Sequence, residues 1–307
     1  MKYNLVIFGV KDISKEFIKY VHEHICNVDL VVTIDQEITK EGVVSGFSPM
    51  DELESQYGIK LYKTKDYTLR DEISAKFFEE NQFDIGISMN WSKLIPETIL
   101  NCFTIGVFGL HGSCGYLPFG QGRATLNWSL INNERRFIMH MFKLDKFADA
   151  PNIYAKIPFE INEYDNIRTL QYKDYMASKI LVSQLLDDYK DGKPIIPTLQ
   201  DKDPQKSYRG RKPEEGRINL LENTRKIYSL VRAVSHPFPG AYLYKGEDKI
   251  MVWRVQPFDG IMDFSDYKLG EVIEVMDGNP IVRTVDGSML ILEYEPVNVI
   301  NVGDLLR

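Results

Sequence analysis

The stretch YNLVIFGVKDISKEFIKYVHEHICNVDLVVTI, residues 3–34, has the pattern of a strand, a helix and a second strand. Residues 3–10 form a continuous apolar run, which is typical of a parallel strand buried on both faces. Residues 14–26 carry apolar side chains at helical spacing, and residues 29–34 form another strand-like run. A strand, a helix and a strand in this order predict one unit of a parallel sheet.

The same alternation continues as far as residue 111. Helices are expected over residues 50–57 and 69–81, and strands over residues 58–62, 84–89 and 105–111. Strands and helices alternating at these lengths predict an α/β fold with a doubly wound, Rossmann-like parallel sheet. The first turn carries Gly9 alone instead of GxGxxG, so the pattern does not support a dinucleotide site.

The last third of the chain has a different character. Residues 190–215 are rich in Lys, Asp, Pro and Gly, as expected of a surface linker, and residues 220–234 have helical spacing. Five short β-like runs separated by turns follow, which predict a small β-rich domain, an OB-like barrel. We therefore expect two domains, a catalytic one over residues 1–205 and a β-rich one over residues 206–307.

Composition excludes several classes of protein. A net charge of −7 without an obvious basic face makes nucleic acid an unlikely partner and disfavours a membrane surface. No apolar run approaches the roughly 18 residues that span a bilayer. Cys26, Cys102 and Cys114 are far apart and form no CxxC, so a cytoplasmic location is expected. His22 and His24 lack a metal-ligand pattern around them, and no metal site is expected.

The densest cluster of unusual residues is GVFGLHGSCGYLPFGQGRATLNW, residues 106–128, where a strand runs into a glycine-rich loop. Ligands bind at the carboxyl ends of parallel strands, and His111 would serve there as a general base. The loop glycines favour close approach of the backbone to a ligand. A histidine within a strand is also often a core residue, and Asp149 is either its orienting carboxylate or a turn residue.

Four stretches together resemble the methionyl-tRNA and sugar N-formyltransferases over nearly the whole chain. Five residues match the family's pattern G-x-x-N-x-H-x-S-x-L-P in order: Gly106, His111, Ser113, Leu117 and Pro118. Residues 145–150 resemble its second catalytic stretch, in which Asp149 aligns with the family's catalytic aspartate. Residues 208–218 and 231–241 match its Y-x-x-R-x-P-E-D-G-x-I and R-A-x-x-P-x-P-G-A patterns.

The resemblance implies transfer of a formyl group from N10-formyltetrahydrofolate, a co-substrate, to an amine. His111 would remove the amine proton, and Asp149 would orient the imidazole. The folate would lie against five residues, Met89, Asn90, Trp91, Leu110 and Asp145. For two of them, Asn90 and Trp91, the alternative interpretation is a helix start with a packed tryptophan.

This sequence departs from the family at the catalytic asparagine, which Gly109 replaces. The resemblance assigns that asparagine to the developing negative charge on the formyl oxygen. The following loop is longer by three residues, 114–116, and we expect either Ser113 or a loop amide to supply the missing hydrogen-bond donor. A non-catalytic folate-binding relative is the alternative.

The acceptor amine is expected on a nucleotide-linked amino sugar. The region after the second strand, residues 35–54, is mixed to acidic, whereas tRNA formyltransferases carry a basic loop there. The piece VSGFS, residues 44–48, looks more like the sugar N-formyltransferases. Lys11 and Gly112 would contact the acceptor, although an isolated exposed lysine often has no such role. The alternatives are a methionyl-tRNA formyltransferase-like enzyme and an acceptor that is an amino acid or a peptidyl amine. A homodimer is a possible assembly.

Overall fold

The computed structural model describes residues 3–41, 47–145, 152–194, 196–198 and 207–307. Two compact units can be separated by their internal contacts. The first comprises Met1–His111, Met139–Ile157 and Met176–Asp203, and the second comprises Gly112–Ile138, Pro158–Tyr175 and Pro204–Arg307. The units therefore interleave along the chain, while the division into domains at residue 205 stays a prediction.

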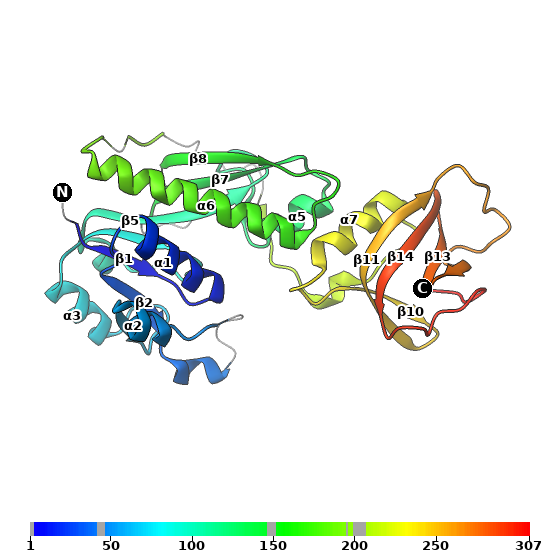
Figure 1. Cartoon of the computed structure of the whole chain (residues 1–307), viewed down its shortest axis with the longest axis horizontal. Helices are drawn as coiled ribbons and strands as arrows, with labels where there is room; N and C mark the ends of the chain where they lie inside the picture. Colours follow the sequence, from blue (N-terminus) through cyan, green and yellow to red (C-terminus); the bar gives the residue numbers. More distant parts are fainter. Residues whose placement is uncertain (1–2, 42–46, 146–151, 195, 199–206) are drawn as a thin grey trace. The chain divides into compact units, whose positions relative to one another are not determined.

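A seven-stranded sheet in the order β3-β2-β1-β4-β5-β7-β8 is formed by the amino-terminal half of the chain (Figure 1). Its strands are β1 (Leu5–Phe8), β2 (Leu30–Ile34), β3 (Lys60–Thr64), β4 (Phe83–Ser88), β5 (Phe103–Ser113), β7 (Arg136–Lys143) and β8 (Ile153–Glu160). The first five strands pair in parallel. The order reverses between β1 and β4, as in doubly wound folds, so the predicted Rossmann-like sheet is confirmed.

The helices up to residue 190 are α1 (Asp12–His24), η1 (Gln36–Glu41), α2 (Asp51–Tyr57), α3 (Glu72–Glu80), α4 (Glu97–Leu100), α5 (Thr125–Ile131) and α6 (Ile167–Lys190). Three of them, α1, α2 and α3, lie where the sequence predicted them, whereas η1, α4 and α5 were not predicted. Helix α3 begins where the Asp71 carboxylate accepts the Ser74 amide (2.9 Å), and α2 ends at Gly58, whose φ of 68° is left-handed. The sequence assigned no element to α6.

The core of the first unit explains the apolar runs of the sequence. Every residue of β1 and β2 is buried, as expected of central parallel strands. The rings of Phe8, Phe78 and Phe103 contact one another, with centroids 6.1–6.2 Å apart in each pair. No helix in the described part of the chain is long and apolar enough to cross a membrane.

The second unit contains an antiparallel sheet in the order β10-β11-β14-β13-β12, which confirms the β-rich carboxyl-terminal part (Figure 1). Its strands are β10 (Ala241–Lys245), β11 (Asp248–Asp259), β12 (Val272–Met276), β13 (Asn279–Thr284) and β14 (Gly287–Glu295). The end of the chain bridges both sides of this sheet, because Lys245 pairs with Leu306 and Glu271 with Leu305. This arrangement protects strand edges, as a barrel does.

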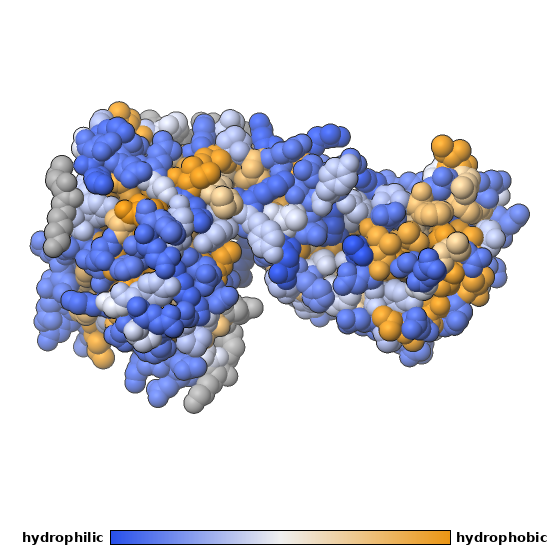
Figure 2. All heavy atoms as spheres, viewed as in Figure 1, coloured by the Kyte–Doolittle hydropathy of each residue, from blue (hydrophilic) through white to orange (hydrophobic). Residues whose placement is uncertain are grey.

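Helix α7 (Thr224–Val234) covers the core of the second unit, and the Asn223 side chain caps its first turn by accepting the Lys226 amide (2.9 Å). The short strands β6 (Gln121–Gly122) and β9 (Ser207–Tyr208) pair, and η2 (Pro213–Gly216) follows them. In Figure 2 apolar side chains lie among polar ones over the carboxyl-terminal sheet. Exposed apolar residues of this unit include Phe258, Ile261 and Met262.

Candidate active site

The carboxyl ends of three parallel strands bring most of the predicted site residues to one edge of the sheet. Phe8 of β1 pairs with Ser88 of β4, and Ser88 pairs with Gly109 of β5. Residues that follow these positions therefore lie at the same edge: Lys11, Met89, Asn90, Leu110 and His111. This is where doubly wound folds bind ligands.

The first turn of α1 is fastened to the turn after β4. The buried hydroxyl of Ser14 donates to the Met89 carbonyl oxygen (2.8 Å), and the Met89 amide donates to the Phe8 carbonyl oxygen (2.9 Å). A Cβ on Gly9 would lie 2.8 Å from that of Ser14, so only glycine permits this approach. Asn90 then adopts φ of 62°, a conformation that asparagine tolerates well, and is exposed at the sheet edge.

Trp91 lies in the core of the first unit. Its side chain is 7% exposed, and its ring makes edge contacts with Tyr67 (centroids 4.7 Å apart) and Phe8 (5.9 Å). The packed-tryptophan interpretation therefore describes this residue in the structure, and its stacking on a pterin stays a prediction.

Gly109 is covered by apolar side chains. A Cβ built on it would lie 2.8 Å from Leu144 Cδ2 and 3.2 Å from Phe142 Cε2. The backbone amide of Leu144 donates to the Val107 carbonyl oxygen (2.7 Å), which fixes Leu144 beside β5. The space that an asparagine side chain would enter is thus occupied by hydrocarbon, which cannot donate a hydrogen bond.

His111 is half-buried near the end of β5, and a second histidine supports its backbone. His140 of β7, which has no exposed surface, has its Nδ1 atom 3.3 Å from the His111 carbonyl oxygen. A carbonyl only accepts, so this hydrogen bond requires a proton on Nδ1 of His140. His140 was not predicted as a site residue, although its polar side chain within the apolar run FIMHMF was a signal in the sequence.

The next two predicted residues belong to the second unit. A Cβ on Gly112 would lie 2.0 Å from Phe137 Cε1, so packing of this ring against the strand explains the glycine. The buried Ser113 hydroxyl donates to the Phe119 carbonyl oxygen (2.7 Å) and accepts the Gly115 amide (3.3 Å). Ser113 therefore organises its own loop, and this geometry does not favour it as a donor to substrate.

The second catalytic stretch is only partly described. Asp145 is exposed just after β7, whereas Asp149 lies outside the described residues, as does most of the piece 44–48. Lys11 is half-buried before α1, and an isolated bridge joins it to Phe47. The roles predicted for Asp149, Asp145, Leu110 and Lys11 stay predictions. Among the described residues, no group of three or more His, Cys, Asp or Glu side chains is placed to hold a metal ion.

The carboxyl-terminal part of the chain matches a known protein family. Residues 211–305 match the family model of the formyl transferase C-terminal domain. The resemblance that the sequence carries to the formyltransferases is thereby confirmed, and the structural relatives agree with it.

One of these relatives is HypX from Aquifex aeolicus, solved in complex with tetrahydrofolic acid, at 15% identity and a TM-score of 0.65. The similarity covers 96% of this chain and 44% of HypX, so the chain spans less than half the length of that relative. At this identity the likeness concerns the fold.

Two further relatives match over nearly their whole length. The N-formyltransferase from Helicobacter canadensis, in complex with folinic acid and dTDP-3-aminofucose, has 16% identity and a TM-score of 0.65, covering 95% of this chain and 100% of that one. Methionyl-tRNA formyltransferase from Clostridium thermocellum has 20% identity and a TM-score of 0.54, covering 84% of this chain and 95% of that one.

Proposed function

We propose that this protein transfers a formyl group from N10-formyltetrahydrofolate to the amino group of a nucleotide-linked amino sugar. The observation that carries the proposal is the position of His111 near the carboxyl end of β5, at the edge where β1 and β4 also end. The formyl transferase C-terminal domain and a relative solved with folinic acid and a nucleotide-linked amino sugar support it.

In the proposed reaction the acceptor amine attacks the formyl carbon. His111 removes a proton from the attacking nitrogen, the bond between the formyl carbon and N10 breaks, and the proton passes to N10 of the departing tetrahydrofolate. General acid–base catalysis of this kind contributes roughly 10²–10⁴ to the rate. Asp149 orients the imidazole, and the hydrogen bond from His140 to the His111 carbonyl fixes the strand that carries it.

Gly109 raises a second candidate function. The proposed transfer needs a donor for the negative charge that develops on the formyl oxygen, and Leu144 and Phe142 occupy the place of the family's asparagine side chain. A protein that binds folate without turning it over would tolerate this change. If the protein is an enzyme, a backbone amide of the loop after His111 must donate the hydrogen bond to the formyl oxygen, as backbone amides do in other oxyanion sites.

A transfer assay tests the proposal. The protein is incubated with N10-formyltetrahydrofolate and dTDP-3-amino sugars, and we expect a product whose mass has increased by one formyl group. His111→Ala and Asp149→Asn should each lower the rate by at least roughly 10² while the unfolding transition stays close to that of the wild type. The chain's net charge of −7 predicts no activity on charged initiator tRNA.

Three outcomes separate the candidates. Efficient formylation of initiator tRNA at physiological salt would refute the sugar acceptor. Saturable folate binding without product for any amine would favour the binding protein. Full activity of His111→Ala would remove His111 from the mechanism.

A further inference from the structure

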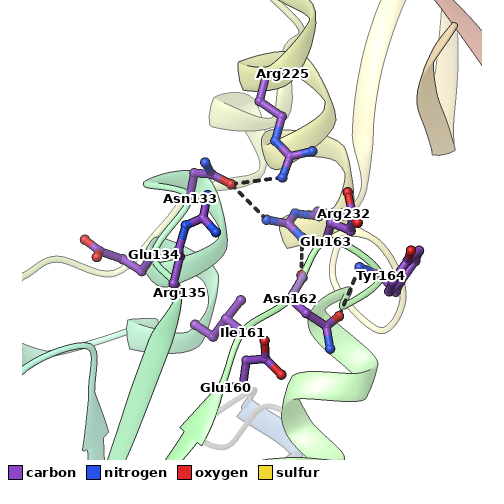
Figure 3. A pocket seen from close by; sticks show the side chains of 10 residues that line it. All are labelled: Asn133, Glu134, Arg135, Glu160, Ile161, Asn162, Glu163, Tyr164, Arg225 and Arg232. Atoms are coloured by element: carbon purple, nitrogen blue, oxygen red, sulfur yellow. Dashed lines mark hydrogen bonds between the residues drawn. The ribbon is translucent and has the colours of Figure 1, made fainter.

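A pocket of about 490 Å³ opens in the second unit (Figure 3). Its lining comes from the turn after α5 (133–135), the loop between β8 and α6 (160–164), and two arginines of α7, Arg225 and Arg232. These arginines are seven residues apart, which places them on one face of the helix. The volume lies within the range of small-molecule sites.

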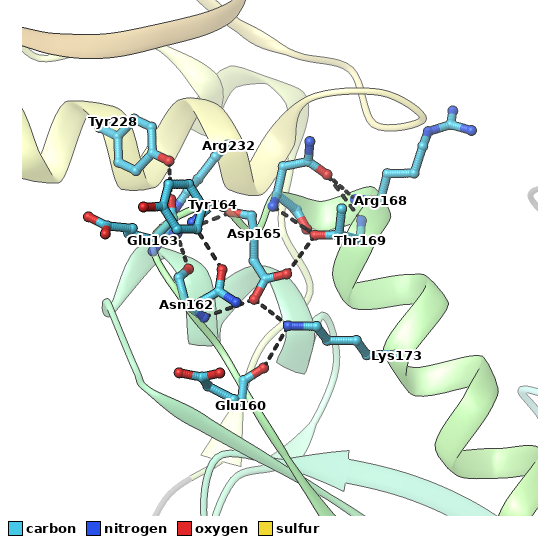
Figure 4. A network of polar contacts seen from close by, with 11 residues as sticks. Glu160, Asn162, Glu163, Tyr164, Asp165, Arg168, Thr169, Lys173, Tyr228 and Arg232 are labelled. Carbon is cyan, nitrogen blue, oxygen red and sulfur yellow. Dashed lines mark hydrogen bonds and ion pairs between the residues drawn. The ribbon is translucent and has the colours of Figure 1, made fainter.

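Arg232 is built into the wall of this pocket. It is 6% exposed, and its Nη1 atom donates to the carbonyl oxygens of Asn162 (3.0 Å) and Asp165 (3.1 Å). The loop that supplies these carbonyls is itself fixed by a polar network, in which the Asp165 carboxylate binds Lys173 and Thr169 (Figure 4). The guanidinium is therefore held in place before any ligand binds.

No described carboxylate forms an ion pair with either of these two arginines, although the charge of Asp165 acts on Arg232. Arg225 and Arg232 each place an Nη2 atom 3.4 Å from the same neutral oxygen, Asn133 Oδ1, and neither forms an ion pair within the described residues. Burial lowers the pKa of Arg232 and the charge of Arg225 adds to this decrease, while Tyr228 and Asp165 oppose it. A buried charge without an ion pair is costly, so an anion at this position would stabilise Arg232, and the exposed Arg225 would supply a second donor to it.

We propose that this pocket binds the phosphate group of a small molecule, with Arg225 and Arg232 as its ligands and Arg135 beside them. The planar guanidinium matches phosphate geometry, and a phosphate oxygen would replace the long contacts to Asn133. Three glutamates, Glu134, Glu160 and Glu163, also line the pocket. Since they form no ion pair with these arginines, they remain as acceptors for the hydroxyl or amino groups of a phosphate ester.

The proposal extends beyond formyl transfer and does not depend on it. Arg232 belongs to residues 231–241, which carry part of the sequence resemblance, yet the transfer reaction assigns it no task. Tyr164 also lines the pocket and is 84% exposed, which makes its ring available for stacking on a base. The phosphate could therefore be inorganic phosphate or part of a nucleoside diphosphate.

Isothermal titration calorimetry with inorganic phosphate, at constant ionic strength set with chloride, tests the site. We expect saturable binding to the wild type. Arg225→Ala should weaken binding about tenfold or more, because it removes a charge-assisted hydrogen bond. Arg232→Lys keeps the charge but loses the fork and should also weaken binding. Arg254→Ala is the matched control, since it removes an exposed arginine of the same unit that lies outside the pocket lining.

Arg225 is exposed, so its replacement should leave the fold intact even where Arg232→Lys does not fold. Wild-type affinity in Arg225→Ala, or no saturable phosphate binding to the wild type at millimolar concentration, would overturn the proposal. The source of the phosphate follows from Tyr164→Ala. If Tyr164→Ala weakens binding of thymidine diphosphate at the site that Arg225→Ala weakens, and leaves the phosphate affinity unchanged, the ligand is a nucleotide. If Tyr164→Ala changes neither affinity, the ligand is phosphate itself.

Discussion

The backbone at Gly109 lies beneath Leu144 and Phe142, and this packing determines what a side chain there would do. Gly109→Asn places a Cβ 2.8 Å from Leu144 Cδ2. The half-buried Leu144 can turn aside, but the buried ring of Phe142 lies 3.2 Å from the new Cβ, so we expect the free energy of unfolding to fall by about 1 kcal/mol. Transfer should not accelerate, because the new amide cannot reach its place. Urea unfolding and the transfer assay measure the two effects.

The double variant Gly109→Asn with Leu144→Ala tests the same explanation by making room. If a lost donor limits the rate, this variant should transfer faster than Leu144→Ala alone, by up to the roughly 10²–10³ that one oxyanion donor supplies. A rate increase of that size in Gly109→Asn alone would show that Leu144 does not block the position.

At the scale of single residues the sequence suggested His111 and Gly109 as site residues, but it did not predict what surrounds them. The supporting contact from His140 and the cover from Leu144 come from β7 and the residue after it, about 30 residues along the chain. Such contacts have no periodicity that a sequence displays. The same holds for Trp91, because a tryptophan that follows a strand can stack on a ligand or pack in the core, and the sequence does not distinguish the two.

The loop from Ser113 to Gly120 is stabilised by the hydroxyl group of Ser113. Ser113 Oγ binds the Phe119 carbonyl oxygen and the Gly115 amide, and a Cβ on Gly120 would lie 2.0 Å from this oxygen atom. We expect Ser113→Ala to lower the free energy of unfolding by about 1–3 kcal/mol, because it leaves buried partners unsatisfied. Calorimetric unfolding measures this change.

The rate of formyl transfer in Ser113→Ala distinguishes a loop residue from a catalytic donor. Since the hydroxyl hydrogen already binds Phe119, the rate should fall by much less than the roughly 10²–10³ of a lost oxyanion donor. A full loss of that size in a variant with wild-type stability would assign Ser113 to the reaction instead.

Elements that lie within a single core were predictable, whereas a helix whose buried residues belong to two units was not. The runs of β1 and β2 are buried throughout, and their sequence pattern shows it. Helix α6 instead buries Ile167 and Leu170 in the core of the second unit and Leu181 and Val182 in the first. Three large apolar side chains between these pairs are exposed, Tyr172, Met176 and Ile180, whereas the small Ala177 is buried. No single apolar face remains for a helical period to reveal.

For the whole molecule, stability should fall in acid partly through Asp165. This carboxylate is 4% exposed and binds Lys173 Nζ (2.6 Å), the Asn162 amide (2.8 Å) and Thr169 Oγ1 (2.9 Å). Burial opposes its charge, but the ammonium of Lys173 and the hydrogen bonds outweigh burial and lower the pKa of Asp165. The folded chain therefore binds this proton less readily than the unfolded chain.

A carboxylate with a lowered folded pKa stabilises the protein fully above its unfolded pKa, about 3.9, and the effect is lost as pH falls through the folded value. We expect Asp165→Asn to lower the free energy of unfolding by about 1.5–3 kcal/mol at pH 7, since hydrogen bonds to a charged group are removed. The difference from the wild type should shrink below about pH 4. Asp191→Asn, at a carboxylate that is 59% exposed, is the control and should change little. Urea unfolding at several pH values gives the answer, and a difference that stays constant down to about pH 2 would show that the charge of Asp165 does not stabilise the fold.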